Sequence, residues 1–290
     1  MTVAAVVTHR RPAETAPAVR MLIDVARSAG ATLRFDVVET AKHGLVAGPN
    51  VEVGGAVAPG ADVAICFALG GDGTILSALR RYAGTGVPVF GVNYGEIGFL
   101  AAVERDDALD GFRSAFAGAF DRVALPGLQL EVSGVRLEDG PPIAINDIAV
   151  ERRQGGRVAS LAYSVGGDEV GRVRCDGLVV ATPAGSTGYN LANGGPVMAW
   201  GAAGFVVSFI APHSLTARAL VVAPSDVLSI HNLSTEEAAD IAIDGRPIAE
   251  LAPGADLLTR YVEDRGTLAQ MAGSSFYSRL RTKFGRLANS

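Results

Sequence analysis

The first part of the chain alternates short apolar runs with amphipathic stretches. The apolar runs predict strands at Val3–Thr8, Thr32–Val38, 63–69 and Pro88–Val92, and the stretches between and after them predict helices at Ala13–Ser28, Ile75–Tyr82 and about Asp106–Ala117. The run at 63–69 is apolar on both faces, as a central parallel strand is. The alternation predicts an open α/β sheet.

The texture changes after about Phe120, and short β-rich runs separated by glycine, proline or aspartate follow. They lie at 121–133, 143–151, 158–165, 177–182, 205–210, 219–231 and 240–251. We therefore expect an α/β domain over 1–120 and a mostly β domain over 121–265. In the last run, Asp244-Gly245 has the signature of a tight hairpin turn.

The last residues, 266–290, contain an amphipathic helix that we expect to pack back on the N-terminal domain. Apolar residues recur there at helical spacing, with basic residues mostly between them: Phe276, Leu280, Phe284 and Leu287, and Arg279, Arg281, Lys283 and Arg286. The basic face is expected to be solvated.

Composition excludes several function classes. The 290 residues carry a formal charge of -5 and a pI near 5.4, which argues against nucleic-acid binding, and no apolar run approaches membrane-spanning length. Cys66 and Cys175 form neither a disulfide framework nor a metal-ligand spacing, and the four histidines are scattered. These features predict a cytoplasmic protein that contacts no membrane and has no metal site built from its own side chains.

The motif Gly70-Gly71-Asp72-Gly73-Thr74 follows the central strand, at the edge where open α/β sheets bind ligands. Glycines allow the backbone to approach phosphates, and the amides at the start of the next helix donate to anions. A carboxylate beside phosphates is repelled unless it meets a proton, a cation or a hydroxyl, so Asp72 is interpreted as a reacting or cation-facing group. The alternative is a turn aspartate that caps the helix.

No lysine follows the glycine loop as in a Walker motif. The chain has only Lys42 and Lys283, and neither is expected near the loop. Nucleotide charge would then be met by backbone amides, arginines or a divalent cation.

A second group of small, hydroxyl and aromatic residues lies between Arg174 and Asn190. It reads as strand, turn and short helix; small residues let a planar ligand approach, and Tyr189 offers an aromatic face with a polar tip. The alternative is a tight strand-helix connection. Arg174 and Asp176 suit either an ion pair or ligand contact.

Asn146-Asp147 interrupts an otherwise apolar strand. A buried carboxylate needs a polar partner, which a bound ribose or amide could supply. A bulge, or a buried polar pair against the neighbouring domain, would also explain these two residues.

Taken in order, four motifs resemble those of NAD kinases. They are Gly70–Thr74; Asn93-Tyr94-Gly95-Glu96-Ile97-Gly98-Phe99-Leu100; Asn146-Asp147; and the stretch from Asp176-Gly177 through Gly195-Pro196. Diacylglycerol and sphingosine kinases and phosphofructokinases carry loops similar to the first motif. In the lipid kinases an Asn-Glu pair typically follows that loop, whereas Ile75-Leu76-Ser77-Ala78 follows here, and the long last motif is the discriminating one.

The resemblance implies a fold and a reaction. The fold is a Rossmann-like open α/β N-terminal domain followed by a β-sandwich-like C-terminal domain, assembled as a homodimer or homotetramer. The reaction moves the γ-phosphoryl group of ATP, or a phosphoryl group of polyphosphate, to the 2′-hydroxyl of the adenosine ribose of NAD. A divalent cation, expected to be Mg²⁺, is held mainly by the nucleotide phosphates. NAD and ATP are the partners implied.

The resemblance also assigns residues. Asp72 is the proton acceptor; with an ordinary pKa it would be a weak base, able to orient the hydroxyl and take its proton late. Phe99 borders the adenine. The substrate-binding set is Asp72, Gly73, Phe99, Asn146, Asp147, Arg174, Asp176, Ala184, Thr187, Gly188, Tyr189, Asn190, Leu191, Ala192 and Arg246.

Four positions depart from the family pattern. The family usually has Thr at Ala184, Ala at Gly188, Ser at Ala192 and often glutamine at Arg246. Two hydroxyls are thereby lost, and Arg246 adds a cation that could meet a phosphate. Two alternatives stay open: a lipid kinase of the same loop superfamily, and a non-catalytic NAD(P)-binding sensor.

Overall fold

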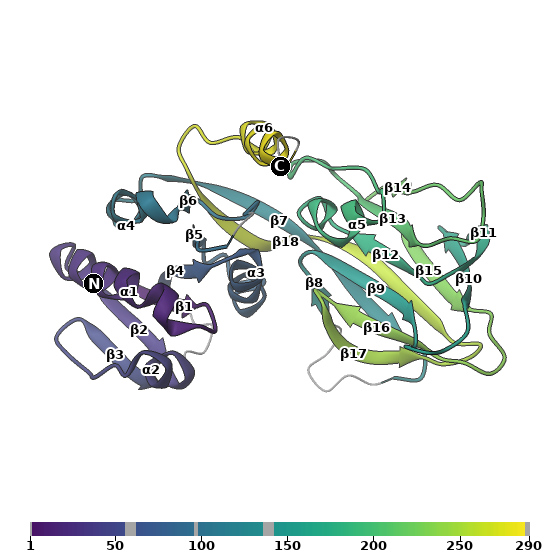
Figure 1. The fold of residues 1–290 in the computed structure, drawn as a ribbon, viewed down its shortest axis with the longest axis horizontal. Helices are drawn as coiled ribbons and strands as arrows, with labels where there is room; N and C mark the ends of the chain where they lie inside the picture. The colour runs from purple at the N-terminus through teal and green to yellow at the C-terminus, as the bar shows by residue number, and fades with distance from the viewer. Residues whose placement is uncertain (1, 56–61, 96–97, 136–141, 288–290) are drawn as a thin grey trace. The chain divides into compact units, whose positions relative to one another are not determined.

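The computed structural model describes residues 2–55, 62–95, 98–135 and 142–287. The chain divides into two compact units, Met1–Ala124 with Arg265–Ser290, and Leu125–Asp264. The domain limits at residues 120 and 265 remain predictions from the sequence. Figure 1 labels the elements of both units.

The N-terminal unit is built on a parallel sheet with the strand order β5-β4-β1-β2-β3. The strands are β1 (Val3–Thr8), β2 (Thr32–Asp36), β3 (Val51–Gly55), β4 (Val63–Gly70) and β5 (Val89–Asn93), with the short β6 (Val103–Glu104) beside β5. The helices are α1 (Pro12–Ser28), α2 (Val37–His43), α3 (Asp72–Arg81) and α4 (Ala108–Phe116), and the 3-10 turn η1 (Arg105–Asp107) precedes α4.

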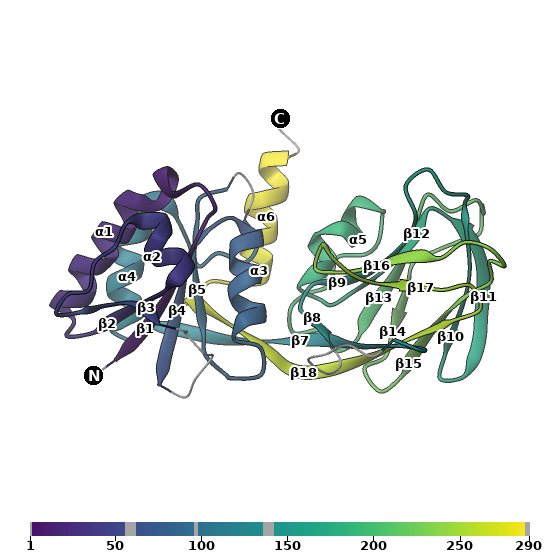
Figure 2. The ribbon, with the colours of Figure 1, turned by 90° about the horizontal axis from the view of Figure 1, so that it is seen from below.

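Helices cover both faces of this sheet, with α1 and α4 on one side and α3 on the other (Figure 2). Phe67 of β4 centres the core on the α1 and α4 side, where its ring packs against Phe90, Phe112 and Phe116. The predicted open α/β sheet is confirmed, and its carboxyl edge carries the glycine loop.

Two predicted boundaries in this unit are wrong. The strand expected over Thr32–Val38 ends at Asp36, because the Asp36 carboxylate accepts the amide of Glu39 at 2.7 Å and caps α2. The helix expected from Ile75 begins at Asp72. The strand β3 was not expected from the pattern.

The C-terminal unit is a sandwich of two sheets. One sheet has the order β14-β13-β12-β9-β16-β17. Its strands are β9 (Asp147–Arg152), β12 (Gly177–Ala181), β13 (Phe205–Ile210), β14 (Leu220–Val222), β16 (Ala239–Ile243) and β17 (Arg246–Leu251).

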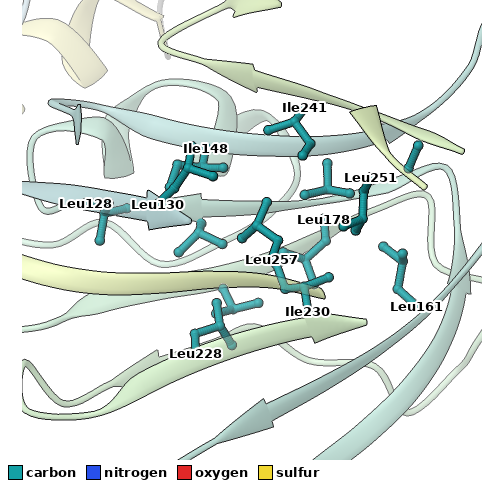
Figure 3. Packing of buried hydrophobic residues seen from close by; sticks show 14 of the residues in the cluster. Leu128, Leu130, Ile148, Leu161, Leu178, Leu228, Ile230, Ile241, Leu251 and Leu257 are labelled. Atoms are coloured by element: carbon teal, nitrogen blue, oxygen red, sulfur yellow. The ribbon is translucent and has the colours of Figure 1, made fainter. Parts of the chain in front are cut away.

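The other sheet contains β10 (Ala159–Val165), β11 (Asp168–Cys175), β15 (Val227–Asn232), β8 (Ile143–Ala144), and parts of β7 (Phe120–Val132) and β18 (Asp256–Met271). Leucine and isoleucine side chains from both sheets pack between them (Figure 3). The expected β-sandwich-like fold is confirmed.

Two predicted strands of this unit need correction, and two strands were missed. The run at 143–151 is two strands, because the chain turns at Ile145-Asn146. The run at 219–231 is also two strands, since a turn closed by the Asp226 amide on the Ala223 carbonyl separates β14 from β15. The strands β11 and β18 were not expected from the pattern.

Candidate active site

The glycine loop joins β4 to α3 in a tight turn. A Cβ at Gly70 would lie 2.2 Å from Oγ1 of Thr74, which excludes a side chain there, whereas a Cβ at Gly71 would make an ordinary contact, 3.6 Å from the Cα of Gly95. Gly73 is exposed and nothing lies within 4 Å of the position a Cβ would take. The loop is therefore tightly packed at Gly70 and exposed at Gly73.

Asp72 occupies the first turn of α3 and does not cap it; the N-cap is Gly71, with no side-chain cap bond. The capping alternative is wrong. The two carboxylate oxygens instead accept the amides of Phe99, at 2.9 Å, and Leu100, at 3.1 Å. The carboxylate is thus held in one orientation by a neighbouring loop.

The pKa of Asp72 is raised above its ordinary value, chiefly by burial. The two amides, and the positive charges of Lys283 and Arg279, pull this pKa down without cancelling the effect of burial. The pKa of Asp72 is therefore higher than the ordinary value expected from the sequence. A raised pKa makes Asp72 a stronger base than a solvated aspartate.

The loop that holds Asp72 belongs to the second motif. Phe99 is buried, and its ring packs against Phe284 with the centroids 6.0 Å apart. The adenine contact expected of Phe99 stays a prediction. Glu96 and Ile97 of this motif lie outside the described residues.

The C-terminal helix α6 (Phe276–Leu287) is in the N-terminal unit, and two of its basic residues, Arg279 and Lys283, are at least partly buried. The expectation of a solvated basic face is wrong for Lys283, which is 4% exposed, and for Arg279, which is half-buried, while Arg281 is exposed. The side chains of Arg286 and Leu287 are outside the described part. Lys283 is close enough to lower the pKa of Asp72, so the view that no lysine approaches the glycine loop is also wrong.

In the C-terminal unit, Asn146 and Asp147 lie where the chain enters β9. The Asp244 carboxylate holds this point through three consecutive amides: Ile145 at 3.2 Å, Asn146 at 2.7 Å and Asp147 at 3.1 Å. Asp244 (φ 48°) and Gly245 (φ 73°) form the turn between β16 and β17, which confirms the predicted hairpin. Asp244 therefore also fixes the backbone at the start of β9, a role that its Asp-Gly turn signature did not predict.

Asp147 is a buried acid without an internal partner. Asp147 is 7% exposed, and its carboxylate makes no hydrogen bond within the described residues. Burial, followed by the negative charges of Asp244 and Glu151, raises its pKa to about 7. Oδ1 of Asn146 is likewise buried with no partner among those residues. Buried polar groups are normally hydrogen-bonded, so these two are well suited to a polar ligand.

The segment after β12 packs directly on Asn146. A Cβ at Gly185 would lie 2.1 Å from the Asn146 carbonyl oxygen, and that same oxygen accepts the amide of Thr182 at 2.8 Å. The segment continues through the 3-10 turn η2 (Gly185–Thr187) into the short helix α5 (Tyr189–Ala192). The structure therefore brings the segment and the Asn146-Asp147 pair together.

Members of this segment differ in what they can offer a ligand. Tyr189 is 36% exposed and its hydroxyl donates to the Glu151 carboxylate at 2.6 Å. Ala184 and Asn190 are buried, and the Asn190 amide nitrogen donates to the carbonyls of Ser186 and Pro196. Of the rest, Gly188 and Ala192 are exposed, and Thr187 and Leu191 are half-buried.

The remaining predicted residues are more scattered. Asp176 pairs with Arg152 at 2.7 Å, so an ion pair with Arg174 is wrong. Arg174 is exposed on β11, and Arg246 is exposed at the start of β17. Sequence reasoning missed Glu151, although strand alternation places it on the same face of β9 as Asp147.

No group of three or more His, Cys, Asp or Glu side chains within the described ranges could hold a metal ion. Mg²⁺ commonly uses one or two carboxylates together with substrate phosphates, so a single acid such as Asp72 fits a cation carried by a nucleotide. None of the helices in the described ranges is long and apolar enough to cross a membrane.

Comparisons with known proteins place these features in a family. The ATP-NAD kinase N-terminal domain model matches residues 26–118, and the ATP-NAD kinase C-terminal domain model matches residues 145–260. An NAD kinase of Lachnoclostridium phytofermentans is 34% identical over 230 residues, covering 77% of this chain and 81% of its own. An NAD kinase of Thermobifida fusca is 33% identical over 285 residues, covering 94% of this chain and 86% of its own.

Two solved structures share the fold. A yeast NADH kinase complexed with NADH superimposes with a TM-score of 0.86 at 19% identity, covering 98% of this chain and 88% of its own. An NAD kinase from Archaeoglobus fulgidus in complex with ATP gives a TM-score of 0.73 at 24% identity, covering 100% of both chains.

Proposed function

The chain belongs to the NAD kinase family, and on that premise we propose that it transfers the γ-phosphoryl group of ATP to the 2′-hydroxyl of the adenosine ribose of NAD, giving NADP. Family membership sets aside the lipid kinase alternative. The observation that carries the proposal is Asp72, a carboxylate of raised pKa held by two amides beside the open Gly73.

Asp72 orients the ribose hydroxyl and accepts its proton. Phosphoryl transfer passes through a loose transition state, in which positioning and charge neutralisation matter more than a strong nucleophile. The bond between the γ-phosphorus and the bridging oxygen breaks, the bond to the 2′-oxygen forms, and ADP leaves. The exposed Gly73 lets the phosphates approach the backbone at the start of α3.

Residues of the C-terminal unit bind the dinucleotide. Asn146 and Asp147 offer acceptors that have no partner among the described residues, and the exposed ring of Tyr189 offers a face for a base or ribose. The rest of the substrate-binding set belongs to this proposal with the roles implied by family resemblance: Gly73, Phe99, Arg174, Asp176, Ala184, Thr187, Gly188, Asn190, Leu191, Ala192 and Arg246.

ATP is the proposed donor, a choice supported by the ATP complex of the Archaeoglobus fulgidus kinase; polyphosphate is the competing donor. A divalent cation, Mg²⁺, would be held mainly by the nucleotide phosphates and would supply charge neutralisation. We also infer a cytoplasmic homodimer or homotetramer.

The test is NADP(H) formation by the purified protein with NAD or NADH, Mg²⁺, and ATP or polyphosphate in turn. Asp72→Asn should retain NAD binding by calorimetry and lose about 10²- to 10⁴-fold in turnover. The control Asp110→Asn changes an aspartate whose side chain is 85% exposed on α4, and should leave turnover unchanged. Equal turnover in D72N and wild type would refute the role of Asp72, and NAD binding without NADP formation from either donor would support the sensor.

A further inference from the structure

The Phe99–Ala101 segment lies between Asp72 and the C-terminal helix. Its amides at Phe99 and Leu100 donate to Asp72, and the Leu100 carbonyl accepts Nε2 of Gln270 at 3.0 Å. The Ala101 carbonyl accepts the guanidinium of Arg279, which also donates to Oε1 of Gln270. The orientation of the Asp72 carboxylate therefore depends on a segment that α6 holds from the other side.

Lys283 begins a second set of contacts from α6. Its ammonium donates to Oε1 of Glu104 at 2.7 Å, and the other oxygen of Glu104 accepts Nδ2 of Asn93 at 2.8 Å. Oδ1 of Asn93 accepts the Gly95 amide at 2.9 Å, and Gly95 lies against Gly71. This set ends at the residue immediately before Asp72.

Within the described part of the chain, two cations and a second acid lie near Asp72. The positive groups that face it are Arg279 and Lys283, both on α6, and Glu104 on β6 faces both cations. The carboxylate itself accepts the backbone amides of Phe99 and Leu100. Loss of either cation would remove a positive charge that favours the ionised form of Asp72, which is the form that burial penalises.

We propose that α6 is a positioning element for phosphoryl transfer: Arg279 holds the Phe99–Ala101 segment that orients Asp72, Lys283 holds Glu104 and through it Asn93 and the turn at Gly95, and both cations face the Asp72 carboxylate. The family motifs that carry the resemblance do not include this helix. The inference rests on the proposed function, because kinase activity provides its measurement.

The experiment measures the pH dependence of kcat at saturating NAD and ATP. Lys283→Met removes the charge and keeps the approximate length of the side chain; it should lower kcat, leave the KM for NAD unchanged and move the acidic limb upward by about one pH unit. Glu104→Gln removes the negative neighbour and keeps an acceptor for Asn93, so it should move the same limb downward. Lys283→Arg should restore the wild-type limb.

Arg281→Met is the matched control, because Arg281 is an exposed cation on the same helix. Its profile should superimpose on that of the wild type. Opposite shifts in K283M and E104Q support the proposal, since general loss of stability cannot move one limb in two directions. Profiles that superimpose, or that move the same way, overturn it.

If K283M does not fold, E104Q alone decides: a downward shift supports the proposal and an unchanged limb overturns it. A wild-type protein that makes no NADP contradicts the proposed function itself. A wild type that makes NADP, with variant profiles that do not move, contradicts only the role of α6.

Discussion

Replacing Asp147 by asparagine should change the stability of the NAD-free C-terminal unit more favourably at alkaline pH than at acidic pH. The same substitution should weaken NAD binding. The pKa of Asp147 is about 7 in the folded protein, against an ordinary 3.8. Between these two values the folded protein keeps a proton that the unfolded chain has released, so stability falls as pH rises through this window. The ionised side chain is therefore carried at a free-energy cost.

The size of this cost follows from linkage. At about 1.36 kcal/mol per pKa unit, the ionised Asp147 costs about 4 kcal/mol above pH 7, and the cost grows by about 2.5 kcal/mol between pH 5 and pH 8. Asparagine does not titrate. Its buried amide costs about the same at both pH values, so the change with pH isolates the carboxylate charge.

Urea unfolding can be followed through Trp200, the only tryptophan, which is buried in the C-terminal unit. Between pH 5 and pH 8, the unfolding free energy of D147N should rise by about 2.5 kcal/mol relative to that of the wild type. Asp168→Asn, an exposed aspartate in the same unit, should show no such change. A difference of the same size at both pH values would refute the reasoning.

The same variant tests whether the ionised Asp147 carboxylate binds NAD. A carboxylate that accepts a ribose hydroxyl makes a charged hydrogen bond worth about 1.5–3 kcal/mol, so NAD affinity measured by calorimetry at pH 8 should fall by about 10- to 100-fold in D147N. Unchanged affinity would remove Asp147 from the binding site.

Two further variants test how Asn146-Asp147 is held in place. Asp244→Asn keeps a residue that tolerates the positive φ but loses one acceptor oxygen and the charge, so the unfolding free energy measured with urea should fall by about 1–2 kcal/mol. Its control is Asp264→Asn, which changes an exposed aspartate that also has a positive φ and should leave the unfolding free energy unchanged. Gly185→Ala places a methyl group 2.1 Å from the Asn146 carbonyl oxygen, so the unfolding temperature and NAD affinity should both fall, whereas Gly188→Ala, with its nearest atom at 3.4 Å, should keep the wild-type unfolding temperature. An unaffected G185A protein would show that this contact is not needed.

Local pattern was sufficient for much of the fold. Strands buried on both faces, helices with one apolar face and an Asp-Gly turn are properties of neighbouring residues, so β4, α1 and the β16–β17 hairpin followed from the pattern. The error at Val37 had a local signal too, because Asp36 and Glu39 have the spacing of a helix N-terminal capping pair.

The amino-acid sequence by itself determined the two-part architecture, the kinase family, and the glycine loop with Asp72 at the carboxyl edge of a parallel sheet. Only the tertiary structure decided which charges surround the acids: Lys283 and Arg279 near Asp72, and Asp244 beneath Asp147. The physical reason is that periodicity shows which face of an element is buried but not which distant element covers it. A pKa depends on that covering, because burial and charge act through space and not along the chain.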